Sequence, residues 1–134
     1  MAKKQSAKYS MADYMTAQKA ETPVRMYLTL PTGEPTDDYL LVVGTESARY
    51  RNAKFSFERR MMALAAIEDD KQRSEQLSYH RAEILAACVL GWSFDEEWSE
   101  EAALELIVGA PYIGDLVDKF ISKRHNFFAK ASTK

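Results

Sequence analysis

The sequence Val24-Arg25-Met26-Tyr27-Leu28-Thr29-Leu30, followed after residues 31–38 by Tyr39-Leu40-Leu41-Val42-Val43-Gly44, decides the fold of this chain. Apolar and polar residues alternate in the first run, and its residue types favour β-strands. The segment between the runs is rich in proline and aspartate and contains a glycine, which is typical of a turn-rich connection. The two runs therefore predict a β-hairpin, and a two-stranded hairpin needs other elements to cover it.

Long stretches with apolar residues at helical spacing follow the hairpin. The first predicted helix covers about residues 48–69, with Thr45 or Ser47 as its N-cap. The second covers about residues 74–90, and Gly91 ends it, as glycine beyond a helix end commonly does. The apolar residues of the first helix form two adjoining stripes, so we expect more than one of its faces to be covered and its phenylalanines to lie in the core. The stripes consist of Phe55, Met62 and Ala66, and of Phe57, Met61 and Leu64.

Two shorter helices complete the predicted fold. Ser99 is the expected N-cap of the third helix, and Glu100 and Glu101 suit the positive end of its dipole. Gly109 stops this helix and Pro111 opens the fourth, at a position where proline is tolerated. The fourth helix has the clearest amphipathic pattern, formed by Ile113, Leu116, Val117, Phe120 and Ile121. The predicted fold class is therefore α+β, mostly α-helical, with about four helices and an N-terminal β-hairpin.

The chain of 134 residues fits one domain. We expect a flexible N-terminal arm at residues 1–22, a single α+β domain at residues 23–128 and a flexible C-terminal tail at residues 129–134. The arm is interpreted either as a docking segment or as a frayed end, because it carries Tyr9, Met11, Tyr14 and Met15. The sequence shows no secretory signal and no stretch apolar enough to cross a membrane, so a cytoplasmic location is expected.

Residues that could support catalysis or metal binding are few. Cys88 lies in an apolar run and is expected to be a buried thiol, since a catalytic thiol needs an electropositive and partly exposed setting. His80 and His125 have no Cys, His or Asp partner at metal-ligand spacing. The sequence has no glycine-rich phosphate loop and no nucleophile elbow, and the carboxylates of residues 95–97 belong to a solvated loop. We therefore expect no enzyme activity, no cofactor and no metal site.

Charge is distributed unevenly along the chain. Residues 95–118 carry only acidic charges, whereas the N-terminal segment and the residues after 118 are basic. One interpretation is a solvated acidic helix face between basic ends, and the other is head-to-tail pairing between copies. The arginines and Lys54 of the first helix suggest nucleic-acid binding as a minor alternative. Helical spacing, however, scatters these charges around the helix axis. We expect neither nucleic-acid nor membrane binding.

An aromatic cluster, Trp92, Phe94 and Trp98, lies between the second and third helices. One interpretation is that these rings pack the junction between the two helices. The other is that one ring stays partly exposed as an anchor for a partner protein, because tryptophan is enriched at interface hot spots. Both interpretations can hold for different residues of the cluster.

Several short motifs follow one another in the second half of the chain: a Gly-Trp step with an acidic loop, a capped helix, a proline-opened helix and a closing Arg-x-Asn-Phe-Phe. They are Leu90-Gly91-Trp92-Ser93-Phe94-Asp95-Glu96, Ser99-Glu100-Glu101-Ala102, Ala110-Pro111-Tyr112-Ile113, and Asp118-Lys119-Phe120-Ile121 with Arg124-His125-Asn126-Phe127-Phe128. This arrangement resembles the tail assembly chaperones of long-tailed bacteriophages. The strand pair followed by Gly44-Thr45-Glu46-Ser47 is similar to the N-terminal part of the same family, so the likeness covers about residues 23–128.

The resemblance implies a function that consists of binding alone. Members of this family bind the tape measure protein and the tail tube protein during tail assembly, and they are absent from the mature virion. They keep a long, helical, aggregation-prone partner soluble, and many also exist in a longer, frameshifted form. For this chain the resemblance implies the cytoplasm of the bacterial host and weak homo-oligomers. The alternatives are a structural head–tail connector or minor tail protein of the virion, and a small DNA-binding regulator.

Partner-binding residues are expected among the aromatic and methionine side chains. Methionine-rich surfaces can re-pack around varied partners, so each methionine from Met11 onward is a candidate. The residues we expect to contact a partner are Trp92, Phe94, Trp98, Met61, Met62, Phe127 and Phe128.

Overall fold

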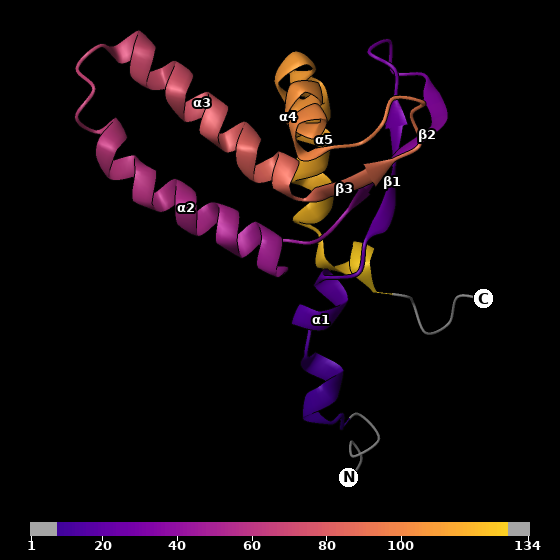
Figure 1. The fold of residues 1–134 in the computed structure, drawn as a ribbon. Helices are drawn as coiled ribbons and strands as arrows, with labels where there is room; N and C mark the ends of the chain where they lie inside the picture. Colours follow the sequence, from indigo (N-terminus) through magenta and orange to yellow (C-terminus); the bar gives the residue numbers. More distant parts are fainter. Residues whose placement is uncertain (1–7, 129–134) are drawn as a thin grey trace.

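The computed structural model describes residues 8–128, so residues 1–7 of the expected arm and the expected tail at residues 129–134 lie outside the described part (Figure 1). Within it, three strands form one antiparallel sheet and five α-helices pack around or beside it. The elements are η2 (Met11–Tyr14), α1 (Ala17–Ala20), β1 (Val24–Thr29), β2 (Pro35–Val42), α2 (Ala48–Leu64), α3 (Asp70–Ala87), β3 (Val89–Trp92), α4 (Glu100–Gly109), α5 (Pro111–Ile121) and η3 (Arg124–Phe127). The α+β class is confirmed, but the described residues contain five helices rather than about four, and η2 and α1 precede the β-hairpin.

The predicted β-hairpin is present as β1 and β2. Met26 lies opposite Leu40 in the antiparallel register, and both side chains are buried. The turn between the strands contains Gly33 at a φ of 94°, a conformation that glycine adopts without steric cost. The second strand begins at Pro35, earlier than predicted, and the hydroxyl of Thr36 donates a hydrogen bond to the carbonyl oxygen of Leu28 at 2.7 Å.

The third strand corrects the prediction for residues 89–91. These residues were expected to end a helix, but Val89–Trp92 pairs with β2, with Gly91 opposite Leu41. A Cβ added at Gly91 would lie 3.1 Å from Cδ1 of Leu41, so the glycine lets the Leu41 side chain lie over the strand. The sheet order is therefore β1-β2-β3, with the hairpin strand β2 in the centre.

The helix ends follow local capping chemistry. Ser47, not Thr45, caps α2, because its hydroxyl accepts a hydrogen bond from the backbone N–H of Tyr50. The predicted cap at Ser99 and the predicted opening of α5 by Pro111 are both confirmed. The α2 helix ends at Leu64, earlier than predicted, and α3 begins directly after its own cap at Asp69.

The helices α2 and α3 run side by side in opposite directions and form a helical hairpin whose turn lies far from the sheet (Figure 1). The α2 helix packs chiefly against α3, and Leu64 is its one fully buried residue. The expectation that more than one face of this helix is covered is therefore wrong, because a helix at the edge of the molecule has a single neighbour to pack against.

The core lies between the sheet and the pair α4–α5. The amphipathic pattern of α5 is confirmed, since Ile113, Val117 and Ile121 all point into the core. They meet the buried face of the sheet and the C-terminal end of α3, where Cys88 is fully buried. The prediction of a buried thiol is also confirmed.

Candidate protein-binding surfaces

The aromatic residues at the end of β3 pack against the core. The ring centroids of Trp92 and Phe94 are 5.1 Å apart, and the ring planes are tilted by 52°. The Nε1–H of Trp92 donates a hydrogen bond to the carbonyl oxygen of Glu96 at 2.8 Å. Trp98 is also partly buried, and its Nε1 has no acceptor among residues 8–128. These rings hold the loop after β3 against the domain, and the more exposed apolar surface lies elsewhere.

The two phenylalanines near the C-terminus differ in burial. Phe127 is 6% exposed, and its ring meets that of Phe120 edge-on at a centroid distance of 5.9 Å. Its side chain is therefore part of the core. Phe128 is partly buried and lines a shallow groove together with Tyr14 and His125.

Methionine side chains supply much of the exposed apolar surface. Of the five methionines in residues 8–128, Met26 is buried and the other four are exposed. Met61 and Met62 lie near the end of α2, close to the turn of the helical hairpin, and Met62 is 82% exposed. The other two, Met11 and Met15, lie in the N-terminal segment, well apart from that turn in Figure 1.

The N-terminal segment combines its methionines with aromatic rings. Tyr9 and Tyr14 are exposed, and their ring centroids lie 6.4 Å apart in an edge-on arrangement. Met11 and Met15 are exposed beside them. This short segment therefore presents four large apolar side chains to solvent, and its two methionines are among the candidates for partner binding.

Phe55 was expected in the core but is 62% exposed. It shares one face of α2 with Arg59 and Met62, because these residues follow at helical spacing. The guanidinium carbon of Arg59 lies 5.4 Å from the centre of the Phe55 ring. We term Phe55, Arg59 and Met62 the α2 ridge. The spacing was visible in the sequence, but nothing in the sequence identified which stripe of the helix faces α3.

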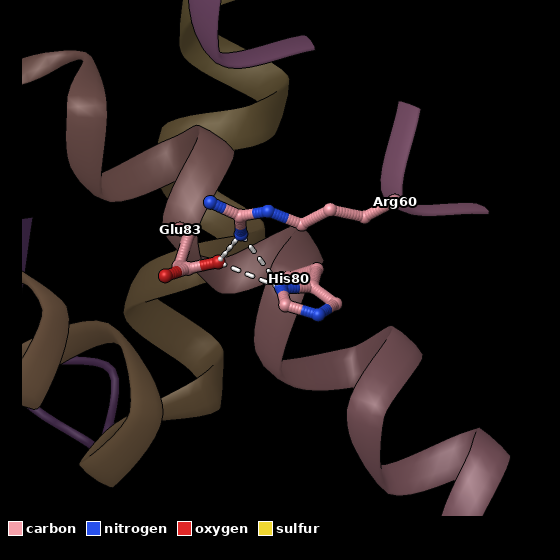
Figure 2. Close-up of polar contacts among 3 residues, drawn as sticks. All are labelled: Arg60, His80 and Glu83. Atoms are coloured by element: carbon pink, nitrogen blue, oxygen red, sulfur yellow. Dashed lines mark hydrogen bonds and ion pairs between the residues drawn. The ribbon is translucent and has the colours of Figure 1, made fainter. Parts of the chain in front are cut away.

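A polar cluster of Arg60 from α2 with His80 and Glu83 from α3 joins the two helices (Figure 2). Nη1 of Arg60 lies 2.7 Å from Oε1 of Glu83 and 3.0 Å from Nδ1 of His80. The same His80 nitrogen lies 2.8 Å from Oε1 of Glu83. The histidine Nδ1 can thus accept a hydrogen bond from Arg60 or, when it carries a proton, donate one to Glu83. Arg60 is partly exposed, so the cluster fastens the helical hairpin without being sealed from water.

A second arginine ties α2 to the rest of the domain. Nε of Arg49 donates a hydrogen bond to the carbonyl oxygen of Ala87 at 2.6 Å, and its Nη2 forms an ion pair with Glu100 at 3.1 Å. The basic residues of α2 thus divide between intramolecular contacts, as for Arg49 and Arg60, and the exposed ridge, as for Arg59.

A groove of about 720 Å³ lies between α3 and the pair α4–α5, and Tyr50 of α2 also lines it. We term it the α3–α5 groove. Its apolar lining includes Tyr79, Leu85, Ile107 and Val108, and its charged residues are Glu75, Arg81, Asp115 and Asp118. Tyr79 and Val108 are exposed, so apolar surface reaches the rim of the groove. The volume is within the range that binding sites commonly occupy.

The one cysteine, Cys88, is buried and has low nucleophilicity. Burial raises the pKa of the Cys88 thiol to about 12, and the guanidinium of Arg49 opposes this shift only in part. The thiol therefore stays protonated near neutral pH, and a protonated buried thiol is a poor nucleophile.

No group of three or more His, Cys, Asp or Glu side chains within residues 8–128 is arranged to hold a metal ion. None of the helices in the same range is both long enough and apolar enough to cross a membrane. The chain matches no family model, no curated protein and no solved structure.

Proposed function

We propose that this chain is a tail assembly chaperone of a long-tailed bacteriophage, which binds the tape measure protein and helps to recruit tail tube subunits. The observation that best supports the proposal is the exposure of four methionines, Met11, Met15, Met61 and Met62, on two separate segments. The order of motifs from the Gly-Trp step to the closing Arg-x-Asn-Phe-Phe adds support, because it resembles that family.

Exposed methionine suits a protein that holds varied helical segments. The side chain is unbranched, flexible and polarisable, so it adapts to partner surfaces of different shape. Promiscuous binders use such surfaces because they can re-pack around each partner. In this chain Tyr9 and Tyr14 lie in the same segment as Met11 and Met15. The rigid tyrosine rings add aromatic contact area to the flexible contact area of the methionines.

The separation of the two methionine sites suits an elongated partner. One site lies on the N-terminal segment and the other near the turn of the α2–α3 helical hairpin (Figure 1). Two weak contacts on one chain reinforce each other when both engage the same partner, because the second contact forms at a high effective concentration. A long helical tape measure protein offers such paired contacts repeatedly, and several copies of the chaperone can coat it in the host cytoplasm.

The proposal is tested by co-expression with the tape measure protein of the same genome, followed by affinity purification. We compare the wild-type chain with Met11→Gln/Met15→Gln and Met61→Gln/Met62→Gln, which keep side-chain length while making it polar. Leu30→Gln is the matched control, because Leu30 is an exposed apolar residue in the connection between β1 and β2. The wild type and the control should keep the tape measure protein soluble, and each methionine pair should lower the co-purified amount severalfold.

A tape measure protein that stays insoluble beside the wild-type chain would overturn the proposal. Mass spectrometry of purified virions then separates the two virion alternatives from the chaperone. A chaperone should be absent from mature particles, whereas a head–tail connector or minor tail protein should be present in fixed proportion to the other virion proteins.

A further inference from the structure

We propose that the α2 ridge of one molecule docks into the α3–α5 groove of a second copy, so that the chain associates head to tail. The partner in this inference is the chain itself, and the inference stands whether or not the tape measure protein is the client. It rests on two exposed apolar surfaces, a helix face and a groove, that carry opposite charge.

The ridge is the convex partner. Phe55 is 62% exposed and Met62 is 82% exposed, although both are large apolar residues in a regular helix. They project from the side of α2 opposite Arg60 and Leu64, which contact α3 and the interior. No element within residues 8–128 covers them, so the ridge is a ready surface for another molecule.

The groove is the concave partner, and it lies on another side of the molecule. The residues of α3 that meet Arg60 are His80 and Glu83, whereas Ser78 and Ala82 of the same helix line the groove. Helical spacing places these two pairs on opposite faces of α3. The groove is lined chiefly by α3, α4 and α5, and the ridge lies on the side of α2 that faces away from α3, so a molecule cannot fill its own groove with its own ridge. Only a second copy can bring the two surfaces together.

Charge favours this pairing over a pairing of like surfaces. Three carboxylates and one arginine line the groove, which leaves it with an excess of negative charge. The ridge carries the guanidinium of Arg59 between its two apolar residues. A basic, apolar ridge against an acidic, apolar groove is complementary in both respects, whereas two ridges would bring arginines together.

A contact between the ridge of one molecule and the groove of the next produces an open-ended row of copies. When the ridge of each molecule fills the groove of the next, the interface is heterologous, and a row of copies keeps one free ridge at one end and one free groove at the other. A few side chains bury much less surface than the interfaces of stable complexes, so the association should be weak. Weak, open-ended association would let copies line up along an extended partner.

The test is the oligomeric state of the full-length chain, measured by sedimentation equilibrium over a broad range of concentration. The ridge variant is Phe55→Gln/Met62→Gln and the groove variant is Val108→Lys. All three positions are exposed, so the variants should fold, which circular dichroism and thermal unfolding check. Met11→Gln/Met15→Gln is the matched control, because it removes exposed methionines that belong to neither surface.

The average mass of the wild type and of the control should rise with concentration beyond that of a dimer. The ridge and groove variants should each weaken self-association at least about tenfold, since burying a single phenylalanine or methionine contributes that much or more. An equimolar mixture of the two variants should form dimers and nothing larger, because each variant retains one competent surface. A two-fold dimer that exchanges its two ridges would also show complementation, but its wild-type mass would stop at that of a dimer.

Three results would overturn the proposal. The first is a wild-type chain that stays monomeric at every concentration. The second is a mixture of ridge and groove variants that associates no better than either variant alone. The third is a groove variant that self-associates normally but fails to bind the tape measure protein, which would assign the groove to the client instead of a second copy.

Discussion

Gly44 lies directly against the ring of Phe127. A Cβ added at Gly44 would stand 3.3 Å from both Cδ2 and Cε2 of that ring. The same Cβ would stand 3.4 Å from Cβ of Ala20, whose carbonyl oxygen accepts a hydrogen bond from the Gly44 N–H at 3.0 Å. The end of the sheet, α1 and η3 therefore meet at a point where the absence of a side chain allows close approach.

Substitution Gly44→Ala is expected to destabilise the protein by roughly 1–3 kcal/mol, as overpacking of a well-packed core does. The added methyl group would push on the buried Phe127 ring, which also contacts Phe120. Urea unfolding of the variant measures the loss. In the double variant Gly44→Ala/Phe127→Leu the combined loss should be smaller than the sum of the single losses, because the smaller side chain gives the methyl group room. Strict additivity would contradict this account of the contact.

Gly109 supplies the matched control. It is the last residue of α4, and a Cβ added there would meet nothing within 4 Å. Gly109→Ala should therefore leave stability unchanged or raise it by up to about 1 kcal/mol, since alanine loses less backbone entropy in a helix than glycine does. Equal destabilisation by the two substitutions would show that the Phe127 ring is not the cause at Gly44.

Much of the fold could be predicted because its signals are local. In β1 the alternating residue types of the sequence match the alternating burial of the strand: Met26 and Leu28 are buried, and Arg25 is exposed. The cap at Ser99 and the opening proline of α5 act on the backbone within one helical turn, so the sequence alone contains them. The core face of α5 follows from spacing in the same way.

The remaining features depend on contacts between distant segments. Val89–Trp92 is a short apolar run that continues the apolar end of α3, and periodicity cannot tell such a strand from helix. Only the position of Leu41 explains why residue 91 is glycine. The candidate surfaces show the same limit. Both stripes of α2 are apolar, and the side that carries Phe55 is exposed because α3 occupies the other.

Ser47→Ala is expected to cost about 1–2 kcal/mol of stability. The Ser47 hydroxyl accepts a hydrogen bond from the N–H of Tyr50 at 3.2 Å and donates one to the carbonyl oxygen of Gly44 at 2.6 Å. The residue is fully buried, so its loss leaves the Tyr50 N–H without a nearby substitute partner, whereas the Gly44 carbonyl oxygen keeps the hydrogen bond from the backbone N–H of residue 47 at 3.1 Å. Ser99→Ala is the comparison, because Ser99 caps α4 in an exposed position, and water can replace its hydroxyl. Chemical denaturation should show the larger loss at Ser47, and a larger loss at Ser99 would contradict the argument.

The Cys88 thiol should react slowly in the native protein. Near neutral pH, alkylation by iodoacetamide should be slower by orders of magnitude than in the denatured chain, because the thiol is buried and its pKa is raised to about 12. Mass spectrometry of the alkylated protein against time gives both rates. Rapid alkylation of the folded chain would show that the region around α3 and β3 opens readily.

The same thiol makes stability depend on pH in the alkaline range. The pKa of Cys88 is raised from 9.0 to about 12 by burial, so the folded state favours the protonated thiol more than the unfolded state does. Its contribution is complete below pH 9 and is lost as the pH rises from 9 toward 12. The free energy of unfolding should therefore fall across this window, and more steeply for the wild type than for Cys88→Ala. Parallel curves for the two proteins would contradict the buried-thiol explanation.

The contact between Arg60 and Glu83 should stabilise the helical hairpin only modestly. Nη1 of Arg60 lies 2.7 Å from Oε1 of Glu83, but the two side chains are 47% and 33% exposed, so water and salt screen the pair. A double-mutant cycle with Arg60→Gln and Glu83→Gln should give a coupling energy of at most about 1 kcal/mol, and this energy should shrink as salt is added. Arg59→Gln is the control, because Arg59 lies over the Phe55 ring on the exposed ridge, and it should show no coupling to Glu83. A coupling that salt leaves unchanged would mean that the pair is held away from water in solution.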